Sequence, residues 1–373
     1  MRHLHAVETT YRLGSVSKAA RAISISQPAI TQAIAKMEKQ LDWPLFERRP
    51  DGMVPAPSAI LLAPRIAAAL SHIGSSRVTM TQMRAMIAVA DAGSYARASL
   101  ATGLSQPSLN RSIADLSVAL RRSLIERRGR GTMLTEAGRR VVRGYRLARA
   151  ELEAGLSEVA ALSGRETGRM TIGAMPLSRA RLLPSALTRF NATHPEVRLR
   201  IVEGAYADLI EPLLDGEIDV LIGAIRERHP GDEVDQRALF EDRPVVVGRK
   251  GHPIAASPGI ALMAAYPWTV PASGTPLRVQ WDRLFTDRGI TIPRVPIECG
   301  SVMTIRQILI DTDFLTLLSP DQVRVELEAG WLRIVSTLPT DIVRTIGMTT
   351  RSGWRPTQLQ RAFIAFLEDA VTS

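Results

Sequence analysis

The chain contains one segment of its sequence twice. Copy one, LGSVSKAARAISISQPAITQAIAKMEKQLDWPLFERR, begins at Leu13 and aligns without a gap on copy two, AGSYARASLATGLSQPSLNRSIADLSVALRRSLIERR, which begins at Ala92. The offset between matched residues is constant at 92 − 13 = 79. Because a solenoid needs about three or more stacked units, two copies predict a duplicated small domain instead.

Each copy has the apolar spacing of a three-helix unit. The third helix begins at Ser26 or Ser105, whose hydroxyl can cap open backbone amides, and the proline two residues later lacks only an N–H without a helical partner. Its apolar stripe comprises Ile30, Ile34, Met37 and Leu41 in copy one and Leu109, Ile113, Leu116 and Leu120 in copy two. This period predicts a helix with one buried face.

The opposite face of each third helix is polar. It carries Gln27, Thr31 and Gln32 in copy one and Gln106, Asn110 and Arg111 in copy two. A helix fits the major groove of DNA, where amide and guanidinium side chains pair with base edges. The basic segments that follow, with Arg48 and Arg49 or with Arg128 and Arg130, suit a wing against phosphates. The alternative is a small helical bundle with a solvated polar face.

The positive charge is concentrated in the first part of the chain. Residues 1–165 hold 24 Lys and Arg against 12 Asp and Glu, whereas the remainder holds 47 − 24 = 23 against 37 − 12 = 25. Such asymmetry favours a polyanionic partner for the first part and a different role for the rest. Double-stranded DNA is the leading candidate.

Several classes of protein are not expected. The N-terminal residues have no continuous apolar core for secretion, and no stretch approaches the roughly 20 apolar residues that span a bilayer. The single cysteine, Cys299, cannot form an internal disulfide. The six histidines lack metal-ligand spacing, and no phosphate-binding or nucleophile motif occurs. We therefore expect a cytoplasmic protein that is neither an enzyme nor a membrane protein, without metal or cofactor.

From Arg169 the pattern changes to alternating strands and helices. The predicted strands are 170–174, 197–203 and 220–223, and the predicted helices between them are 182–191 and 209–214. This alternation predicts a parallel sheet with helices on its faces, and ligands bind beyond the carboxyl ends of such strands. The loops that qualify are 175–178, 204–206, 271–276 and 300–304.

Both copies resemble the DNA-binding domain of LysR-type regulators. The matching residues are Gly14-Ser15, Ser26-Gln27-Pro28 and, in copy two, Leu134-Thr135-Glu136-Ala137-Gly138. Copy one has Gln32 where the family has Arg, and copy two has Ser117 where it has Glu. The resemblance implies base and phosphate contacts at Gln27, Pro28, Thr31 and Gln32, and at Gln106, Pro107, Asn110 and Arg111.

The remaining chain resembles the LysR-type effector domain. Matching features are Leu182-Leu183-Pro184, His194-Pro195 and Gly251-His252-Pro253. The resemblance implies a two-lobed, periplasmic-binding-protein-like (type 2) α/β fold, and a pocket formed by Leu177, Ser178, Ser273, Gly274, Ser301 and Thr304. Four arginines near this proposed pocket favour an anionic organic effector, although surface solvation explains them equally well: Arg179, Arg181, Arg278 and Arg306.

The sequence thus predicts a multidomain α plus α/β protein. The expected parts are winged helix-turn-helix domains at 1–60 and 79–138, a short linker helix at 61–78, a linker helix at 139–165 and an effector domain at 166–373, with lobe one at 168–243 and 345–373 and lobe two at 244–344. In the family the second linker helix pairs two subunits. The alternative is a helix packed only against its own wing domain.

The expected function is sequence-specific regulation of transcription under the control of a small effector, in a catabolic pathway for a sugar or an aromatic acid. The resemblance implies promoter DNA, RNA polymerase and further copies of the chain, as a dimer or tetramer, as partners. The alternative is a solute-binding sensor whose N-terminal half serves oligomerisation. The duplicated basic half discriminates the two, because a solute-binding protein has no need of it.

Overall fold

The computed structural model describes residues 1–49, 52–128, 131–164, 168–226, 232–255, 258–338 and 342–372, with backbone alone for 127, 128 and 372. Contacts divide the chain into two compact units. The N-terminal unit comprises Met1–Gly168 with Asp215–Glu217, and the C-terminal unit comprises Arg169–Leu214 with Ile218–Ser373. Each unit is described by itself below.

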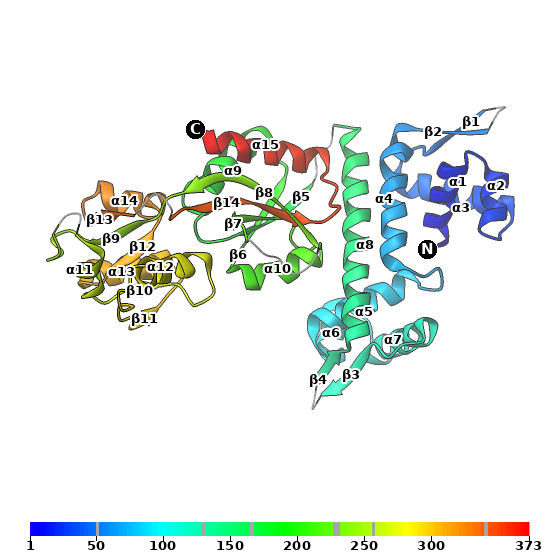
Figure 1. The fold of residues 1–373 in the computed structure, drawn as a ribbon. Coiled ribbons are helices and arrows are strands. Elements are labelled where there is room, and N and C mark those ends of the chain that lie inside the picture. Colours follow the sequence, from blue (N-terminus) through cyan, green and yellow to red (C-terminus); the bar gives the residue numbers. More distant parts are fainter. Residues whose placement is uncertain are drawn as a thin grey trace. The chain divides into compact units, whose positions relative to one another are not determined.

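The N-terminal unit contains the same winged helix-turn-helix twice, as the repeat predicts (Figure 1). Copy one comprises α1 (Arg2–Leu13), α2 (Val16–Ala22), α3 (Gln27–Leu41), β1 (Phe46–Arg49) and β2 (Gly52–Pro55). Copy two comprises α5 (Met80–Ala92), α6 (Tyr95–Thr102), α7 (Gln106–Leu120), β3 (Ile125–Arg128) and β4 (Gly131–Leu134). In each copy the two strands form an antiparallel hairpin, the wing.

The third helix of each copy is capped as predicted. The hydroxyl of Ser26 accepts a hydrogen bond from the backbone N–H of Ala29 at 3.4 Å, and that of Ser105 accepts one from Ser108 at 3.3 Å. Ile30 and Ile34 of α3 are buried in the core of copy one, and Leu109 of α7 is buried in that of copy two. These caps and stripes fix where each helix begins and which face remains in solvent.

Each wing leads into a long helix, α4 (Pro57–Ile73) or α8 (Glu136–Ala161), and these two helices lie side by side (Figure 1). Gly144 of α8 faces the backbone carbonyl of His72 near the end of α4, and Gly155 faces Leu62 near its beginning. The pair is therefore antiparallel. Much of the face of α8 that was expected to meet a second subunit, or the helix's own wing domain, packs within the chain. Val142 and Tyr145 are buried in the core of copy two and Val159 in that of copy one, while Leu156 is 46% exposed.

A buried ion cluster lies between the two helices. Arg65 of α4 contacts Glu151 at 3.1 Å and Glu158 at 2.8 Å, both on α8, and its side chain is only 7% exposed. Burial alone would lower the pKa of Arg65, but the hydrogen bonds and charges of Glu158 and Glu151 outweigh it, so the pKa lies above its ordinary value. The guanidinium stays charged and joins α4 to α8 at two points.

The C-terminal unit has two lobes joined by two crossing segments. Lobe one is a five-stranded sheet in the order β6-β5-β7-β14-β8, in which β5, β6 and β7 are parallel and β14 is antiparallel to both neighbours. Its strands are β5 (Arg169–Ala174), β6 (Arg198–Glu203), β7 (Val220–Ala224), β8 (Val234–Asp242) and β14 (Arg344–Arg351), with helices α9 (Leu182–Thr193), α10 (Tyr206–Leu214) and α15 (Gln358–Thr372). The predicted parallel strands are present, and the returning strand makes the sheet mixed.

Lobe two contains a three-stranded sheet, β12-β9-β13, and a parallel pair, β10-β11. Its strands are β9 (Val245–Arg249), β10 (Thr269–Val270), β11 (Ile297–Glu298), β12 (Thr316–Leu318) and β13 (Leu332–Thr337). Its helices are α11 (Ile260–Ala264), α12 (Pro276–Thr286), α13 (Val302–Asp311), the 3-10 turn η1 (Pro320–Val323) and α14 (Arg324–Glu328). Where the chain crosses between lobes, Arg344 pairs with the buried Asp242, which joins the two crossing segments.

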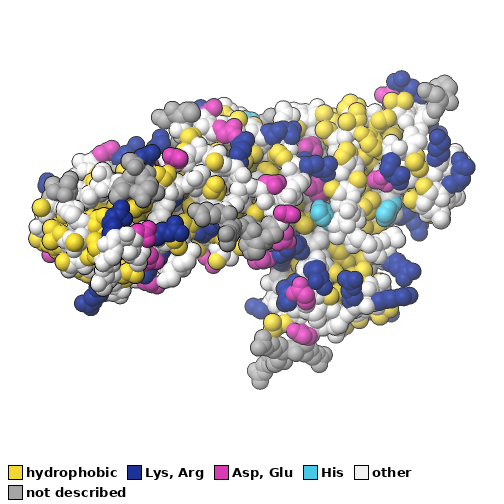
Figure 2. Space-filling view, viewed as in Figure 1, with side chains coloured by type: hydrophobic (Ala, Val, Ile, Leu, Met, Phe, Trp, Pro, Cys, Tyr) yellow, Lys and Arg dark blue, Asp and Glu magenta, His cyan; other side chains and the backbone are white. Residues whose placement is uncertain are grey.

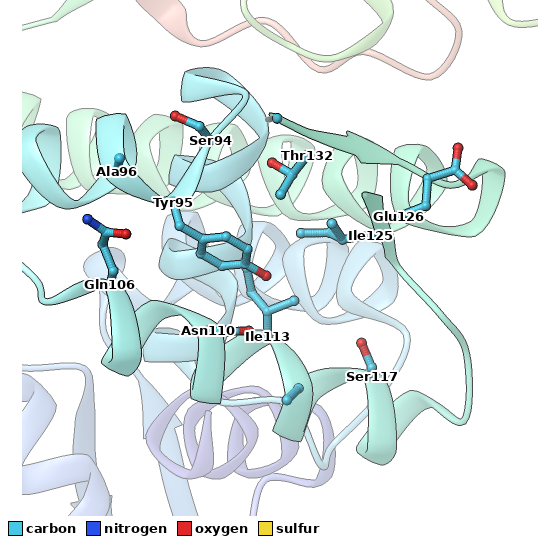
Figure 3. Close-up of a pocket in the computed structure, with 12 residues that line it drawn as sticks. Ser94, Tyr95, Ala96, Gln106, Asn110, Ile113, Ser117, Ile125, Glu126 and Thr132 are labelled. Carbon is cyan, nitrogen blue, oxygen red and sulfur yellow. The ribbon is translucent and has the colours of Figure 1, made fainter. Parts of the chain in front are cut away.

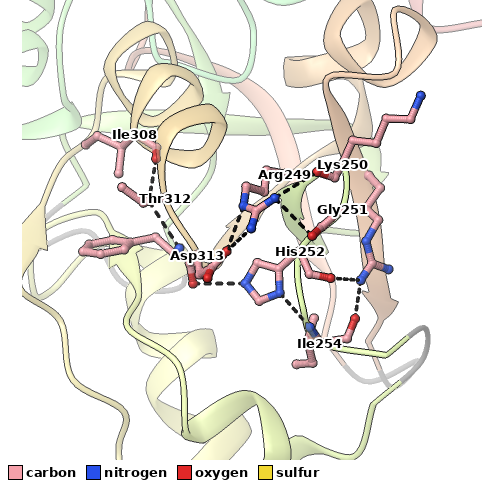
Figure 4. Close-up of polar contacts among 10 residues, drawn as sticks. Arg249, Lys250, Gly251, His252, Ile254, Ile308, Thr312 and Asp313 are labelled. Carbon is pink, nitrogen blue, oxygen red and sulfur yellow. Dashed lines mark hydrogen bonds and ion pairs between the residues drawn. The ribbon is translucent and has the colours of Figure 1, made fainter.

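The Gly251-His252-Pro253 motif closes a turn in lobe two (Figure 4). Gly251 has φ +74, a left-handed conformation that favours glycine. The Nδ1 atom of His252 accepts a hydrogen bond from the backbone N–H of Ile254 at 3.0 Å, so Nε2 carries the proton and donates to the carbonyl of Asp313 at 3.0 Å. The turn therefore requires a neutral imidazole.

We expect the stability of lobe two to fall in mild acid because of His252. Burial, helped by the nearby charges of Arg333 and Arg249, holds the pKa of His252 below 6.5 against the opposing effect of Asp313. The unfolded chain takes up the proton first, so the free energy of unfolding decreases as the pH falls through about 6.5 and levels off below the folded-state pKa. Fluorescence of the buried Trp268 and Trp281 during denaturant unfolding of the full chain measures it.

The control is His252→Gln, in which position 252 cannot titrate in this range. Its unfolding midpoint should vary less with pH than that of the unchanged chain. An identical pH dependence in both proteins would show that His252 contributes nothing to it.

Candidate nucleic-acid interface and effector site

The predicted base-contacting residues lie on the solvent face at the beginning of each third helix. In copy one Gln27, Pro28 and Gln32 are exposed and Thr31 is half-buried. In copy two Gln106, Pro107, Asn110 and Arg111 are all exposed. In both helix-turn-helix copies, the side chains that would meet DNA bases thus lie outside the protein core.

A groove runs along this face in copy two (Figure 3). It has a volume of about 530 Å³ and lies between α6, α7 and the wing. Besides Gln106 and Asn110, it is lined by Tyr95, Ser117 and Thr132, which the sequence analysis did not select. The position of Tyr95, directly after the Gly93-Ser94 pair, could have indicated its place next to the third helix.

The two copies differ at one position behind this groove. In copy one the carboxylate of Glu38 accepts hydrogen bonds from the backbone N–H groups of Leu45 and Phe46, at 2.8 and 3.2 Å, and so holds the start of the wing to α3. The matched residue in copy two is Ser117, whose side chain is too short for that bridge and lines the groove instead. The groove of copy two is therefore shaped partly by the loss of this glutamate.

Only some of the wing arginines that were predicted to contact phosphates lie within the described residues. Arg48 and Arg49 are exposed on β1, and Arg49 pairs with Glu47 at 3.2 Å. The side chain of Arg128 and the whole of Arg130 lie outside the described residues. Figure 2 shows Lys and Arg side chains over the surfaces of both helix-turn-helix units, which agrees with the concentration of positive charge in this part of the sequence.

The predicted effector residues fall into two groups. In lobe one, after β5, Leu177 is buried and Ser178 is fully buried, with its hydroxyl donating to the carbonyl of Met175 at 2.8 Å. In lobe two, Ser273 and Gly274 follow β10, while Ser301 and Thr304 follow β11. Because β10 and β11 are parallel neighbours, their following loops leave the sheet at one edge, which brings this second group together.

The lobe-two residues are exposed, and Ser301 has a structural role. Its hydroxyl caps α13 by accepting the backbone N–H of Thr304 at 3.4 Å. Leu177, by contrast, has no polar side-chain atom, and the hydroxyl of Ser178 is fully buried and donates to Met175.

Each of the four arginines considered for an anionic effector pairs with a carboxylate. Arg179 pairs with Glu203, Arg181 with Asp321, Arg278 with Asp282 and Glu298, and Arg306 with Glu326. Arg181 belongs to lobe one and Asp321 to lobe two, so this 3.1 Å ion pair also connects the lobes. The sequence could not show the pairing of Arg181 with Asp321, because these partners are 140 residues apart.

Within the part of the chain that the structure describes, no His, Cys, Asp and Glu side chains come together in a group suited to a metal ion. In the same part, no helix is both long enough and apolar enough to cross a membrane.

Comparison with known proteins gives the family. Residues 163–372 match the LysR substrate binding domain, and residues 1–59 and 80–139 each match the bacterial regulatory helix-turn-helix protein, lysR family. HTH-type transcriptional regulator GalR of Pseudomonas putida is 28% identical over 375 residues, which covers 96% of this chain and 94% of that protein.

Solved structures share the fold over a shorter length. A full-length OxyR variant from Pseudomonas aeruginosa superposes with a TM-score of 0.60 at 21% identity, covering 80% of this chain and 95% of its own. LysG from Corynebacterium glutamicum, solved with bound effector Arg, gives 0.55 at 20% identity, covering 78% and 97%. About a fifth of the present chain is thus unmatched by either, a length close to one repeat.

Winged recognition helices joined to a two-lobed substrate-binding domain define a DNA-binding transcriptional regulator, and not an enzyme. One helix-turn-helix family matches the chain in two separate segments, and the substrate-binding domain matches more than half of it. These matches identify the family of regulators. The chain belongs to the LysR family.

Proposed function

We propose that both helix-turn-helix units of this regulator bind promoter DNA, each inserting its third helix into the major groove. Gln27 and Gln32 would read bases from α3, and Gln106, Asn110 and Arg111 from α7, while the wing arginines contact phosphates. The observation that carries the proposal is the exposure of the polar face at the capped beginning of both helices. A DNA-binding regulator of this kind acts in the cytoplasm, with RNA polymerase as a further partner.

The effector is proposed to be a small organic anion bound by the C-terminal unit. Support comes from the exposed Ser273, Ser301 and Thr304 at one edge of lobe two and from the nearby arginines. An anionic group would replace Asp321 as the partner of Arg181, so binding would exchange a contact between the lobes for a contact with the ligand. Self-association of the chain, as a dimer or tetramer, is also part of the proposal.

Replacing Arg111 with alanine should weaken binding to the operator by about 1–3 kcal/mol, or about 5- to 150-fold in the dissociation constant. Arg111 is exposed in the first half of α7, where a guanidinium can pair bidentately with guanine. The measurement is fluorescence anisotropy with a labelled duplex, whose sequence is first obtained by footprinting the protein on genomic DNA.

The matched control is Arg77→Ala, which removes an equal charge at an exposed position in the segment before α5. It should change the dissociation constant by less than about twofold. If Arg111→Ala and Arg77→Ala bind as tightly as the unchanged chain, α7 does not read bases. If the unchanged chain protects no genomic DNA, the alternative role in oligomerisation is favoured.

A further inference from the structure

The contacts between α4 and α8 follow the symmetry of the repeat. With the offset of 79, His72 of copy one corresponds to Glu151, and Gly144 of copy two corresponds to Arg65. If the copies are related by a twofold axis, the contact between His72 and Gly144 must have a counterpart between Glu151 and Arg65. Both contacts are present: the carbonyl of His72 lies against Gly144, and Arg65 pairs with Glu151 at 3.1 Å. The two helices are therefore related by an approximate twofold axis within one chain.

The close approach at this pair depends on glycine. A side chain on Gly144 would place its Cβ 2.5 Å from the carbonyl oxygen of His72, a backbone atom that cannot rotate away. A Cβ on Gly155 would lie 2.8 Å from Leu62 and 3.1 Å from the Cβ of Arg65. These two positions allow α8 to lie against α4 at a distance that a larger residue would prevent.

Each of these helices also completes the core of the other copy. Ala69 and Ile73, at the end of α4, are fully or almost fully buried in the core of copy two. Val159, near the end of α8, is buried in the core of copy one. Such reciprocal packing is what two subunits of a symmetric dimer exchange, but here both partners belong to one polypeptide.

Separating the two helices would be unfavourable. It would expose the apolar side chains at both ends to water and break the ion pairs of Arg65 with Glu151 and Glu158. Most of the apolar face of α8 is consequently occupied within the chain, with Leu156 left 46% exposed. The shorter family members in the comparisons match only about four-fifths of this chain, which is the difference expected for one additional copy.

We propose that a single chain is a complete DNA-binding unit with two recognition helices. The internal α4–α8 pair takes the place of a pair of subunits, and α3 and α7 of the same chain occupy the two halves of one operator. This inference rests on the proposed function. If several chains associate, each chain would then add a complete DNA-binding unit to the assembly.

The test uses two full-length variants with one defective unit each. Gln27→Ala/Gln32→Ala disables α3, and Asn110→Ala/Arg111→Ala disables α7; Arg77→Ala is the control. Each variant is footprinted on the operator duplex, alone and after both have been unfolded and refolded together in equal amounts. Circular dichroism and thermal unfolding verify that the substitutions, all at exposed positions, leave the fold intact.

Each variant should lose protection of one half of the operator, on opposite halves, with affinity reduced about tenfold or more. In the mixture each half should be protected only with the reduced affinity of the single variants, because every chain still carries one defective helix-turn-helix unit. The proposal is overturned if one variant keeps the full footprint while the other loses both halves, or if mixing restores protection of both halves at the affinity of the unchanged chain, since the halves would then be read by different chains. Absence of any footprint with the unchanged chain would overturn the proposed function itself, and this inference with it.

Discussion

Replacing Arg65 with alanine should lower the free energy of unfolding of the N-terminal unit by about 3–5 kcal/mol. The guanidinium is the common partner of Glu151 and Glu158, and the exposed fractions of the three side chains are 7%, 15% and 13%. Without it, two carboxylates remain close together with little access to water, and each repels the other. Urea unfolding of the full chain, followed by circular dichroism, measures the loss, since the helices α4 and α8, of 17 and 26 residues, unfold with this unit.

Arg149→Ala is the matched control on α8. Arg149 pairs with Glu153 at 3.9 Å, and both side chains are more than 40% exposed, so the loss should be about 0.5 kcal/mol or less. The triple variant Arg65→Met/Glu151→Gln/Glu158→Gln should recover much of the stability, because it removes the unpaired charges together with the arginine. Equal stability of Arg65→Ala and Arg149→Ala would contradict a structural role for the cluster.

Affinity for the operator should fall about 10³- to 10⁵-fold between about 50 and 200 mM salt. Two helix-turn-helix units with basic wings would share about 6–10 phosphate contacts, and each contact releases condensed counterions from the duplex. The N-terminal 165 residues supply the required excess of 24 − 12 = 12 positive charges. Anisotropy titrations at several salt concentrations give the slope of log K against log [salt].

Two comparisons make the salt experiment specific. Arg48→Ala removes one exposed wing arginine and should reduce the slope by about 1, with a similar change on unrelated DNA. Arg111→Ala should instead weaken binding to the operator more than to unrelated DNA. A binding constant that does not vary with salt would be incompatible with binding through phosphates.

Features that depend on near neighbours were predictable from the sequence. The caps at Ser26 and Ser105 need only a hydroxyl three residues before an open amide, and both are present. The repeat correctly indicated two units of one fold, since identical spacing of apolar residues buries the same stripe. The alternation after Arg169 correctly placed strands β5, β6 and β7.

Features that depend on a distant partner were not predictable. The apolar line along α8 indicated that one face is buried, but it did not specify that much of that face packs within the same chain. Likewise, nothing near Arg181 in the sequence identifies Asp321 as its partner. The proposed pocket residues Leu177 and Ser178 were selected by resemblance, and burial of a side chain depends on how lobe one packs.

The third helices of the two copies are not identical, and the duplication allowed them to diverge. Thr31 is matched by Asn110, Gln32 by Arg111 and Lys36 by Asp115. Two equal subunits about a twofold axis favour a palindromic target, because both present the same side chains to each half-site. Under the proposed function, two unequal recognition helices in one polypeptide would fit a target with unlike halves in a single direction, and the bound regulator would have a defined polarity relative to the start of transcription.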